Sequence, residues 1–220
     1  MMLSDTVQIT ILYDNTASDS RMAANFGFSC LVEAHGVTVL FDTGASADIL
    51  YRNMAAIGID PMTIDIVMIS HDHWDHTGGV ALVAEKTNAR VYVPGAFKGN
   101  LPRAIKIGPA RQISDGIYTT GELAGIEQSL VVQVRGETVV VVGCAHSGVR
   151  GILAAAAEFG RVAALIGGLH GFDELALIAG LKTVCPTHCT RKINEIAAAY
   201  PEKYVAGGAG AVIRYPLGGG

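Results

Sequence analysis

Three histidines and two aspartates lie within six consecutive positions, in the segment SHDHWDH at residues 70–76. Imidazole nitrogens and carboxylate oxygens are the ligand atoms that zinc, iron, manganese and nickel take in proteins. Residues two apart in an extended backbone point to the same side, so His71 and His73 can share one ion. Asp75 and His76 follow where a helix is expected to begin, and they can face a second ion beside the first. The alternative is a solvated loop that is rich in histidine.

Two more histidines follow other expected strands and can point into the same cleft: His146, which precedes Gly148, and His188. We predict both as metal ligands. Cys144 is a further candidate, because a metal ion deprotonates a thiol that binds it, although free cysteines are often small buried residues. His170 could complete a second metal site, hold a substrate or hydrogen-bond the backbone.

The predicted ligand set supports a hydrolytic mechanism. A bound metal ion lowers the pKa of water from about 15.7 to about 7, which gives metal-bound hydroxide at neutral pH. Asp75 would then position this nucleophile and carry a proton, as the one catalytic residue we predict. No Ser-His-Asp or Cys-His pattern offers a better nucleophile. The sequence therefore favours a metal-dependent hydrolase of a small-molecule ester, thioester, lactone or phosphoester.

The spacing His71-x-His73-x-Asp75-His76 resembles the signature of the metallo-β-lactamase superfamily, and residues 40–44 (LFDTG) resemble an aspartate-containing turn of that superfamily. More segments follow in order: residues 117–122, 143–148, 167–170 and 186–190. Together, over residues 7–190, they resemble the branch of proteins similar to 7,8-dihydropterin-6-methyl-4-(ribofuranosyl)aminobenzene-5′-phosphate synthase.

The resemblance implies an α/β fold, a four-layer αββα sandwich, with one or two divalent transition-metal ions. Zn²⁺ is the first choice, and Mn²⁺ and Fe²⁺ are alternatives. The superfamily pattern has an isolated histidine, a bridging aspartate and a last histidine after the first motif. His188 resembles the last histidine, Cys144 lies near the place of the bridging aspartate, and Glu122 stands in the region of the isolated histidine. Asp42 is best interpreted as a carboxylate that orients a ligand histidine.

The branch also implies an alternative function, that of a transferase similar to a pterin-conjugate synthase, in which the metal would activate a phosphoribosyl substrate. A non-catalytic or redox metal-binding protein, with iron in the same site, is the third hypothesis.

Hydrophobic patterning predicts the elements that must position these residues. In the first half, strands are expected at residues 7–13, 29–34, 38–41, 64–69 and 90–93, with helices at 47–57 and 80–87. In the second half, strands are expected at 129–134, 138–142, 162–166, 183–185 and 212–215, with helices at 150–159, 173–181 and 194–200. Two such halves indicate two sheets packed face to face with helices outside. No linker separates them, so we expect one domain spanning residues 1–220.

Composition excludes several classes of protein. The 220 residues are half apolar and 16% charged, with a net charge of −4 and 16 scattered basic residues. This pattern argues against a nucleic-acid-binding surface. Charged residues interrupt the most apolar stretch, 139–169, so no membrane span is expected. Residues 1–12 show no signal peptide, and we expect a cytoplasmic protein with four free cysteines. The oligomeric state stays open.

Overall fold

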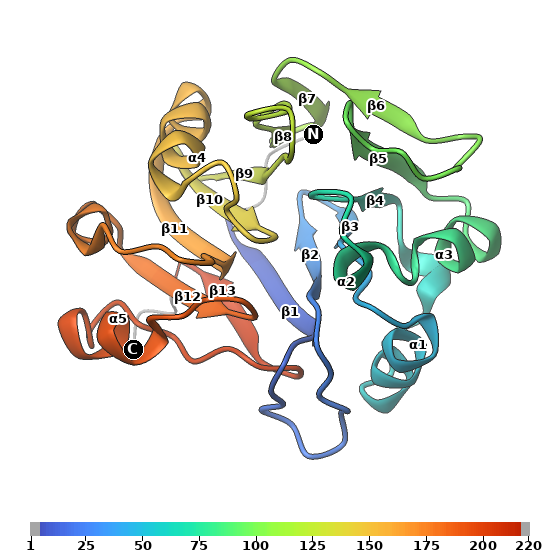
Figure 1. The fold of residues 1–220 in the computed structure, drawn as a ribbon, viewed down its shortest axis with the longest axis horizontal. Coiled ribbons are helices and arrows are strands. Elements are labelled where there is room, and N and C mark those ends of the chain that lie inside the picture. Colours follow the sequence, from blue (N-terminus) through green and yellow to red (C-terminus); the bar gives the residue numbers. More distant parts are fainter. Residues whose placement is uncertain (1–4, 217–220) are drawn as a thin grey trace.

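The computed structural model describes residues 5–216 and contains two mixed β-sheets that pack against each other (Figure 1). The first four and the last four residues lie outside this range. They include part of residues 1–12, where no signal peptide is expected, and both ends of the domain expected to span residues 1–220. The seven-stranded sheet has the order β13-β1-β2-β3-β4-β5-β6. Its strands are β1 (Val7–Tyr13), β2 (Ser29–Ala34), β3 (Val37–Phe41), β4 (Ile66–Met68), β5 (Arg90–Pro94), β6 (Ile105–Ile107) and β13 (Val212–Tyr215).

The six-stranded sheet has the order β12-β11-β10-β9-β8-β7. Its strands are β7 (Arg111–Ser114), β8 (Ile117–Thr119), β9 (Leu130–Val134), β10 (Glu137–Val142), β11 (Arg161–Gly168) and β12 (Thr183–Thr187). Next to the first sheet lie α1 (Ala47–Ala56), the 3₁₀ helix η1 (Pro61–Thr63), α2 (Trp74–Thr77) and α3 (Val80–Lys86). Next to the second lie α4 (Val149–Ala156), η2 (Ala157–Phe159), η3 (Leu175–Gly180) and α5 (Ile193–Ala199).

Alternation along the strands explains why four layers form. On β10, Val139 and Val141 enter the core between the sheets, whereas Val140 and Val142 pack with residues of the α4 and α5 layer. On β2, Val32 faces the inter-sheet core and Leu31 faces the α1 and α3 layer. Since successive side chains of a strand point to opposite faces, a strand that is apolar on both faces must be covered on both. The expected αββα sandwich is confirmed.

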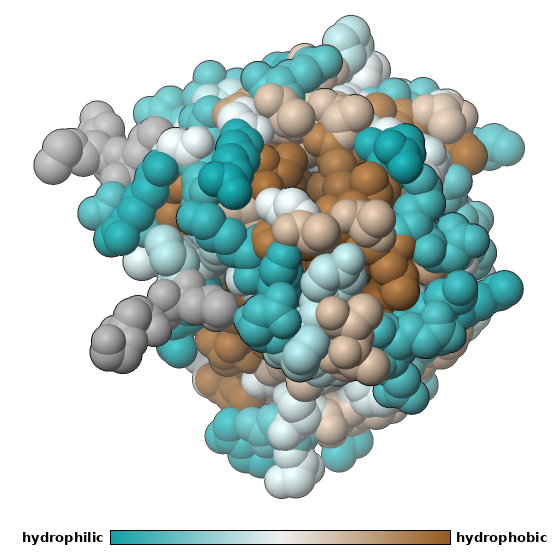
Figure 2. Space-filling view, turned by 90° about the vertical axis from the view of Figure 1, so that its left-hand side faces the viewer, coloured by the Kyte–Doolittle hydropathy of each residue, from teal (hydrophilic) through white to brown (hydrophobic). Residues whose placement is uncertain are grey.

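The outer face beside α4 and α5 shows apolar residues between hydrophilic ones (Figure 2). Partly buried side chains of this layer, Leu153, Phe159 and Leu175 among them, pack on the core beneath. Among residues 5–216, no helix has both the length and the apolar character needed to cross a membrane.

Two expectations about elements need correction. The helix expected at 173–181 is a shorter 3₁₀ helix, η3, whose last N–H bond runs from Leu181 to Ile178. The strands β6, β7 and β8 have no counterpart in the expected list, because each has only three or four residues. Such runs are too short to show an alternating pattern.

Candidate metal centre

The predicted ligands follow the carboxyl ends of parallel strands in both sheets. β3 and β4 run parallel in one sheet, and β10, β11 and β12 run parallel in the other. Parallel strands end at the same edge of a sheet, so the loops that leave them meet there. Asp42 follows β3, the 70–76 segment follows β4, His146 follows β10 and His188 follows β12. Two sheets packed face to face thus bring four separate segments to one place.

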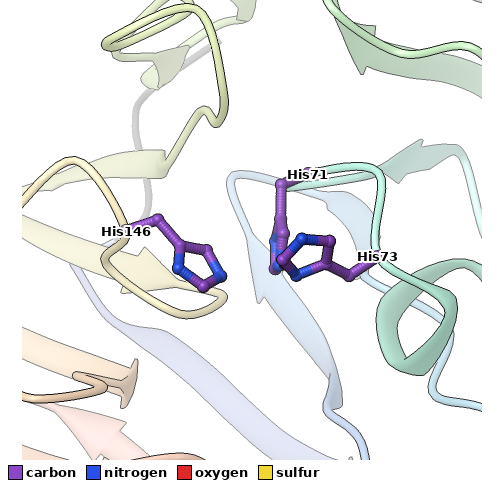
Figure 3. A group of neighbouring side chains, drawn as sticks. All are labelled: His71, His73 and His146. Atoms are coloured by element: carbon purple, nitrogen blue, oxygen red, sulfur yellow. The ribbon is translucent and has the colours of Figure 1, made fainter.

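The first group of ligand atoms belongs to His71, His73 and His146 (Figure 3). The Nε2 atom of His71 lies 2.9 Å from Nδ1 of His73. The ring of His146 lies across from this pair, with its centroid 4.8 Å from that of His71 and 4.9 Å from that of His73. The three nitrogens lie within 4.8 Å of one another. His146 therefore completes the first group of ligand atoms. Glu122 does not reach this group; its carboxylate accepts a hydrogen bond from the backbone N–H of Ala96.

The second group joins Asp75, His76 and His188, all three buried. Oδ2 of Asp75 lies 3.3 Å from Nε2 of His188 and 3.6 Å from Nε2 of His76. The rings of His76 and His188 meet edge to face, with centroids 5.0 Å apart. One carboxylate oxygen and two imidazole nitrogens thus converge at a second point beside the first.

Two buried nitrogen atoms at these points lack a hydrogen-bond partner, Nε2 of His146 and Nε2 of His188. A buried polar atom without a partner costs about 1–3 kcal/mol, so native structures rarely keep one. One such atom lies in each ligand group. Divalent transition metals would satisfy both, since neutral imidazole nitrogen is a preferred ligand. The donor set therefore fits the metal ions that the sequence predicts.

Asn15 fixes which nitrogen of His188 faces the second group. The side-chain oxygen of Asn15 accepts a hydrogen bond from the backbone N–H of Gly27, and its amide nitrogen donates to the carbonyl of His188. These two bonds set the orientation of the amide, so Oδ1 faces Nδ1 of His188 at 3.0 Å. Because an amide oxygen only accepts, Nδ1 must carry the proton. Nε2 is left with a free lone pair for a metal ion.

Asp42 sets the tautomers of two predicted ligands, His76 directly and His71 through Ser70. Its Oδ2 lies 2.7 Å from Nδ1 of His76 and accepts a hydrogen bond from the Ser70 hydroxyl, also at 2.7 Å. That hydroxyl has then used its only proton, so it must accept from Nδ1 of His71, 2.9 Å away. Both imidazoles thereby keep Nε2 unprotonated and turned toward the ligand groups. Asp42 therefore contacts His76 directly and His71 through Ser70, and its role in orienting a ligand histidine stays a prediction.

Burial sets the protonation of these groups. It lowers the pKa of His71, and it lowers that of His76 to about 3 with the help of neighbouring histidines, so both imidazoles are neutral at pH 7. Burial alone would raise the pKa of Asp75, but the neighbouring imidazoles of His188 and His76 outweigh burial and lower that pKa to about 2. Complete burial raises the pKa of Asp42, but the hydrogen bonds that it accepts from the Ser70 backbone N–H and hydroxyl favour the ionised carboxylate. Neutral imidazoles and an ionised Asp75 are the forms that bind metals.

The two candidate ligands left open in the sequence fall in different places. The thiol of Cys144 is buried, and its Sγ lies 3.2 Å from Nε2 of His76, between the two groups. His170 is exposed; its ring lies 5.0 Å from that of His146, at the edge of the centre. A second thiol lies beside Cys144, since Sγ of Cys189 is 3.3 Å from that of Cys144.

Residues 127 and 128 join the two halves of the centre, a role that no pattern in the sequence indicates. Gln128 donates from its backbone N–H to the carbonyl of Ser70 and from its side chain to that of Ile69. Glu127 accepts from both the backbone N–H and the hydroxyl of Ser147 at 2.6 Å. The loop before β9 therefore holds the 70–76 segment and the 144–148 loop in a fixed relation.

Aromatic side chains line one edge of the second group. Phe26 stacks on Trp74, with centroids 5.8 Å apart, and lies 5.2 Å from the ring of His188. Trp74 is 64% exposed, so it forms a wall of the site and is not packed beneath the loop.

The chain is similar to known proteins both in sequence and in structure. The family model of the metallo-beta-lactamase superfamily matches residues 23–158. The 7,8-dihydropterin-6-methyl-4-(beta-D-ribofuranosyl)-aminobenzene-5′-phosphate synthase of Methanocaldococcus jannaschii is 24% identical over an aligned length of 287 residues, which covers 96% of this chain and 97% of the relative. A hydroxyacylglutathione hydrolase of Rhodopseudomonas palustris is 28% identical over 131 residues, covering 54% of this chain and 50% of the relative.

Among solved structures, a metal-dependent hydrolase of the beta-lactamase superfamily, Tm1679, is similar with a TM-score of 0.73 and 26% identity. The similarity covers 94% of this chain and 98% of that one.

Proposed function

The chain belongs to the metallo-beta-lactamase superfamily, and on that premise we propose that it is a hydrolase that uses one or two divalent transition-metal ions. Zn²⁺ is the first choice, with Mn²⁺ and Fe²⁺ as alternatives. The substrate is a small-molecule ester, thioester, lactone or phosphoester. The observation that carries the proposal is the convergence of two ligand groups, each with one buried imidazole nitrogen that has no partner.

The protein residues have distinct tasks in this proposal. His71, His73 and His146 would hold one ion, and Asp75, His76 and His188 the other. Divalent ions in such sites supply Lewis acidity and make water acidic enough to attack at neutral pH. Asp42, through Ser70 and directly, keeps His71 and His76 in the tautomer that binds, and Asn15 does so for His188.

Asp75 is the residue to which we assign the proton transfer. Its carboxylate is ionised at neutral pH because the neighbouring His188 and His76 lower its pKa to about 2 despite burial. The carboxylate lies at the second group beside Nε2 of His188. There Oδ2 would hold the ion, and the other carboxylate oxygen, Oδ1, would orient an attacking water molecule and accept its proton, as a general base must within hydrogen-bond reach.

The second candidate function is that of a synthase-like transferase, because the archaeal synthase matches nearly the whole chain. The alignment of 287 positions includes at least 67 at which this chain of 220 residues has no residue. The relative therefore has segments that this chain lacks. These facts favour hydrolysis over the synthase reaction.

The test is to load the purified protein with Zn²⁺, Mn²⁺ or Fe²⁺ and assay generic ester, thioester, lactone and phosphodiester substrates. We expect turnover that Asp75→Asn reduces about 100-fold or more, the range of general-base removal. The exposed Asp60→Asn is the matched control and should keep full activity.

Pyrophosphate release from 4-aminobenzoate and a phosphoribosyl donor, without hydrolysis, would replace this proposal with the synthase function. Bound iron without either reaction would instead support the redox or non-catalytic role.

A further inference from the structure

Two thiols from different loops touch beside the second ligand group. Cys144 follows β10 and Cys189 follows β12, and their Sγ atoms lie 3.3 Å apart. Sγ of Cys144 is also 3.2 Å from Nε2 of His76. The Sγ atoms of both cysteines and Nε2 of His188 form a further group of ligand atoms within 4.8 Å of one another. Both thiols thus adjoin the imidazole nitrogens that we assign to the second ion.

The backbone leaves room for this contact. A Cβ atom on Gly168, the last residue of β11, would lie 2.9 Å from Sγ of Cys189 and 2.2 Å from the carbonyl oxygen of Gly143. Neither distance is tolerated by a real side chain, so only glycine allows the loops after β10 and β12 to approach across β11. The close approach is therefore built into the fold.

The other two cysteines show what simple packing looks like in this protein. Cys30 and Cys185 are completely buried in the apolar core between the sheets. Cys144 and Cys189 instead have each other and imidazole rings as neighbours. A nitrogen atom close by, Nε2 of His188, is buried without a hydrogen-bond partner. The surroundings of Cys144 and Cys189 are typical of metal ligands and not of cysteines that only pack in the core.

We propose that Cys144 and Cys189 join Asp75, His76 and His188 as thiolate ligands of the second metal ion and make that position selective for thiophilic ions. On binding, each thiol releases its proton to solvent and donates a sulfur lone pair to the ion, with no change of oxidation state. Sulfur ligands favour Zn²⁺, Co²⁺ and Cd²⁺ over Mn²⁺ and Mg²⁺, which prefer oxygen. The inference rests on the proposed metal centre.

The experiment is a Co²⁺ titration of the metal-stripped protein, followed by absorption. Thiolate ligation gives sulfur-to-cobalt charge-transfer absorption in the near ultraviolet, separate from the visible bands of Co²⁺ with nitrogen and oxygen ligands. We expect this absorption in the wild type, and a decrease in both Cys144→Ala and Cys189→Ala. The matched controls Cys30→Ala and Cys185→Ala remove buried thiols and should keep the absorption. Loss of either ligand should also reduce the preference for Cd²⁺ over Mn²⁺ by about tenfold or more.

The outcomes separate the two proposals. Stoichiometric Co²⁺ binding with visible bands but no sulfur absorption would refute the thiolate ligands and leave the metal centre intact. Failure to bind Co²⁺, Zn²⁺ or Mn²⁺ at all would refute the metal centre itself. A variant that fails to fold is replaced by alkylation of the wild-type protein with iodoacetamide and identification of the modified cysteines by mass spectrometry. Saturating Zn²⁺ must protect Cys144 and Cys189 there, and equal labelling with and without Zn²⁺ would contradict the inference.

Discussion

The substitution Asp42→Asn tests the centre most sharply, because exchanging one oxygen atom for nitrogen should reverse the tautomers of two imidazoles. Its Oδ2 accepts from both Ser70 Oγ and His76 Nδ1, and its Oδ1 accepts from the Ser70 backbone N–H, all at 2.7 Å. In Asp42→Asn, an amide nitrogen at the Oδ2 position donates where the carboxylate accepted. Nδ1 of His76 must then accept, which places the proton on Nε2.

The same change reaches His71 through the Ser70 hydroxyl. When the amide donates to this hydroxyl, the hydroxyl proton turns to Nδ1 of His71, and Nε2 of His71 becomes protonated too. In the opposite amide orientation, the nitrogen faces the Ser70 backbone N–H. Two donors then oppose each other, so this orientation is unfavourable as well. Loss of such a supporting contact typically costs 10–100-fold in metal affinity, or about 1.4–2.7 kcal/mol for each ion.

The assay is competition for Zn²⁺ between the protein and a chromophoric chelator, which resolves the affinity of each ion. We expect Asp42→Asn to weaken both ions, and Ser70→Ala to weaken chiefly the ion at His71. Asp65→Asn, which alters an exposed carboxylate that accepts from the Thr38 backbone, is the control. Equal affinities in Asp42→Asn and Asp65→Asn would refute the reasoning from tautomers.

Three further results are expected. His73→Ala should lose one of the two ions and keep the circular dichroism of the wild type, because His73 is exposed and takes no part in a core cluster; full metal retention would disprove its role. Gly143→Ala should lower the free energy of unfolding by about 1–3 kcal/mol, since its Cβ would lie 2.1 Å from Ser70 Oγ; an unchanged melting temperature would count against this close approach. Zn²⁺ at 100 times its Kd should add about 2.7 kcal/mol of stability, and a chelator should remove it; a melting temperature insensitive to both would speak against binding to the folded state.

Much of the fold and of the centre could be predicted because the relevant signals are local. The 70–76 segment shows its ligand spacing directly, and it follows a buried strand. The valines of β10 are apolar on both faces, which requires a covering layer on each side. Since the ends of parallel strands meet at one edge, His146 and His188 could be assigned to the same centre without any knowledge of distances.

The parts that could not be predicted depend on contacts between distant residues. Asn15 and His188 are 173 positions apart, and no property of either residue indicates that they meet. Cys189 has no spacing signal in the sequence that marks it as a ligand, because its contact with Cys144 arises only from the approach of two loops. Glu122 was placed near the isolated histidine because order along the chain was used in place of position in space.

The central claim is that two groups of side chains each bind a metal ion, and anomalous diffraction from crystals grown with Zn²⁺ tests it most directly. We expect one peak among His71, His73 and His146 and a second among Asp75, His76 and His188. Zinc-containing crystals with no peak at either group would contradict it.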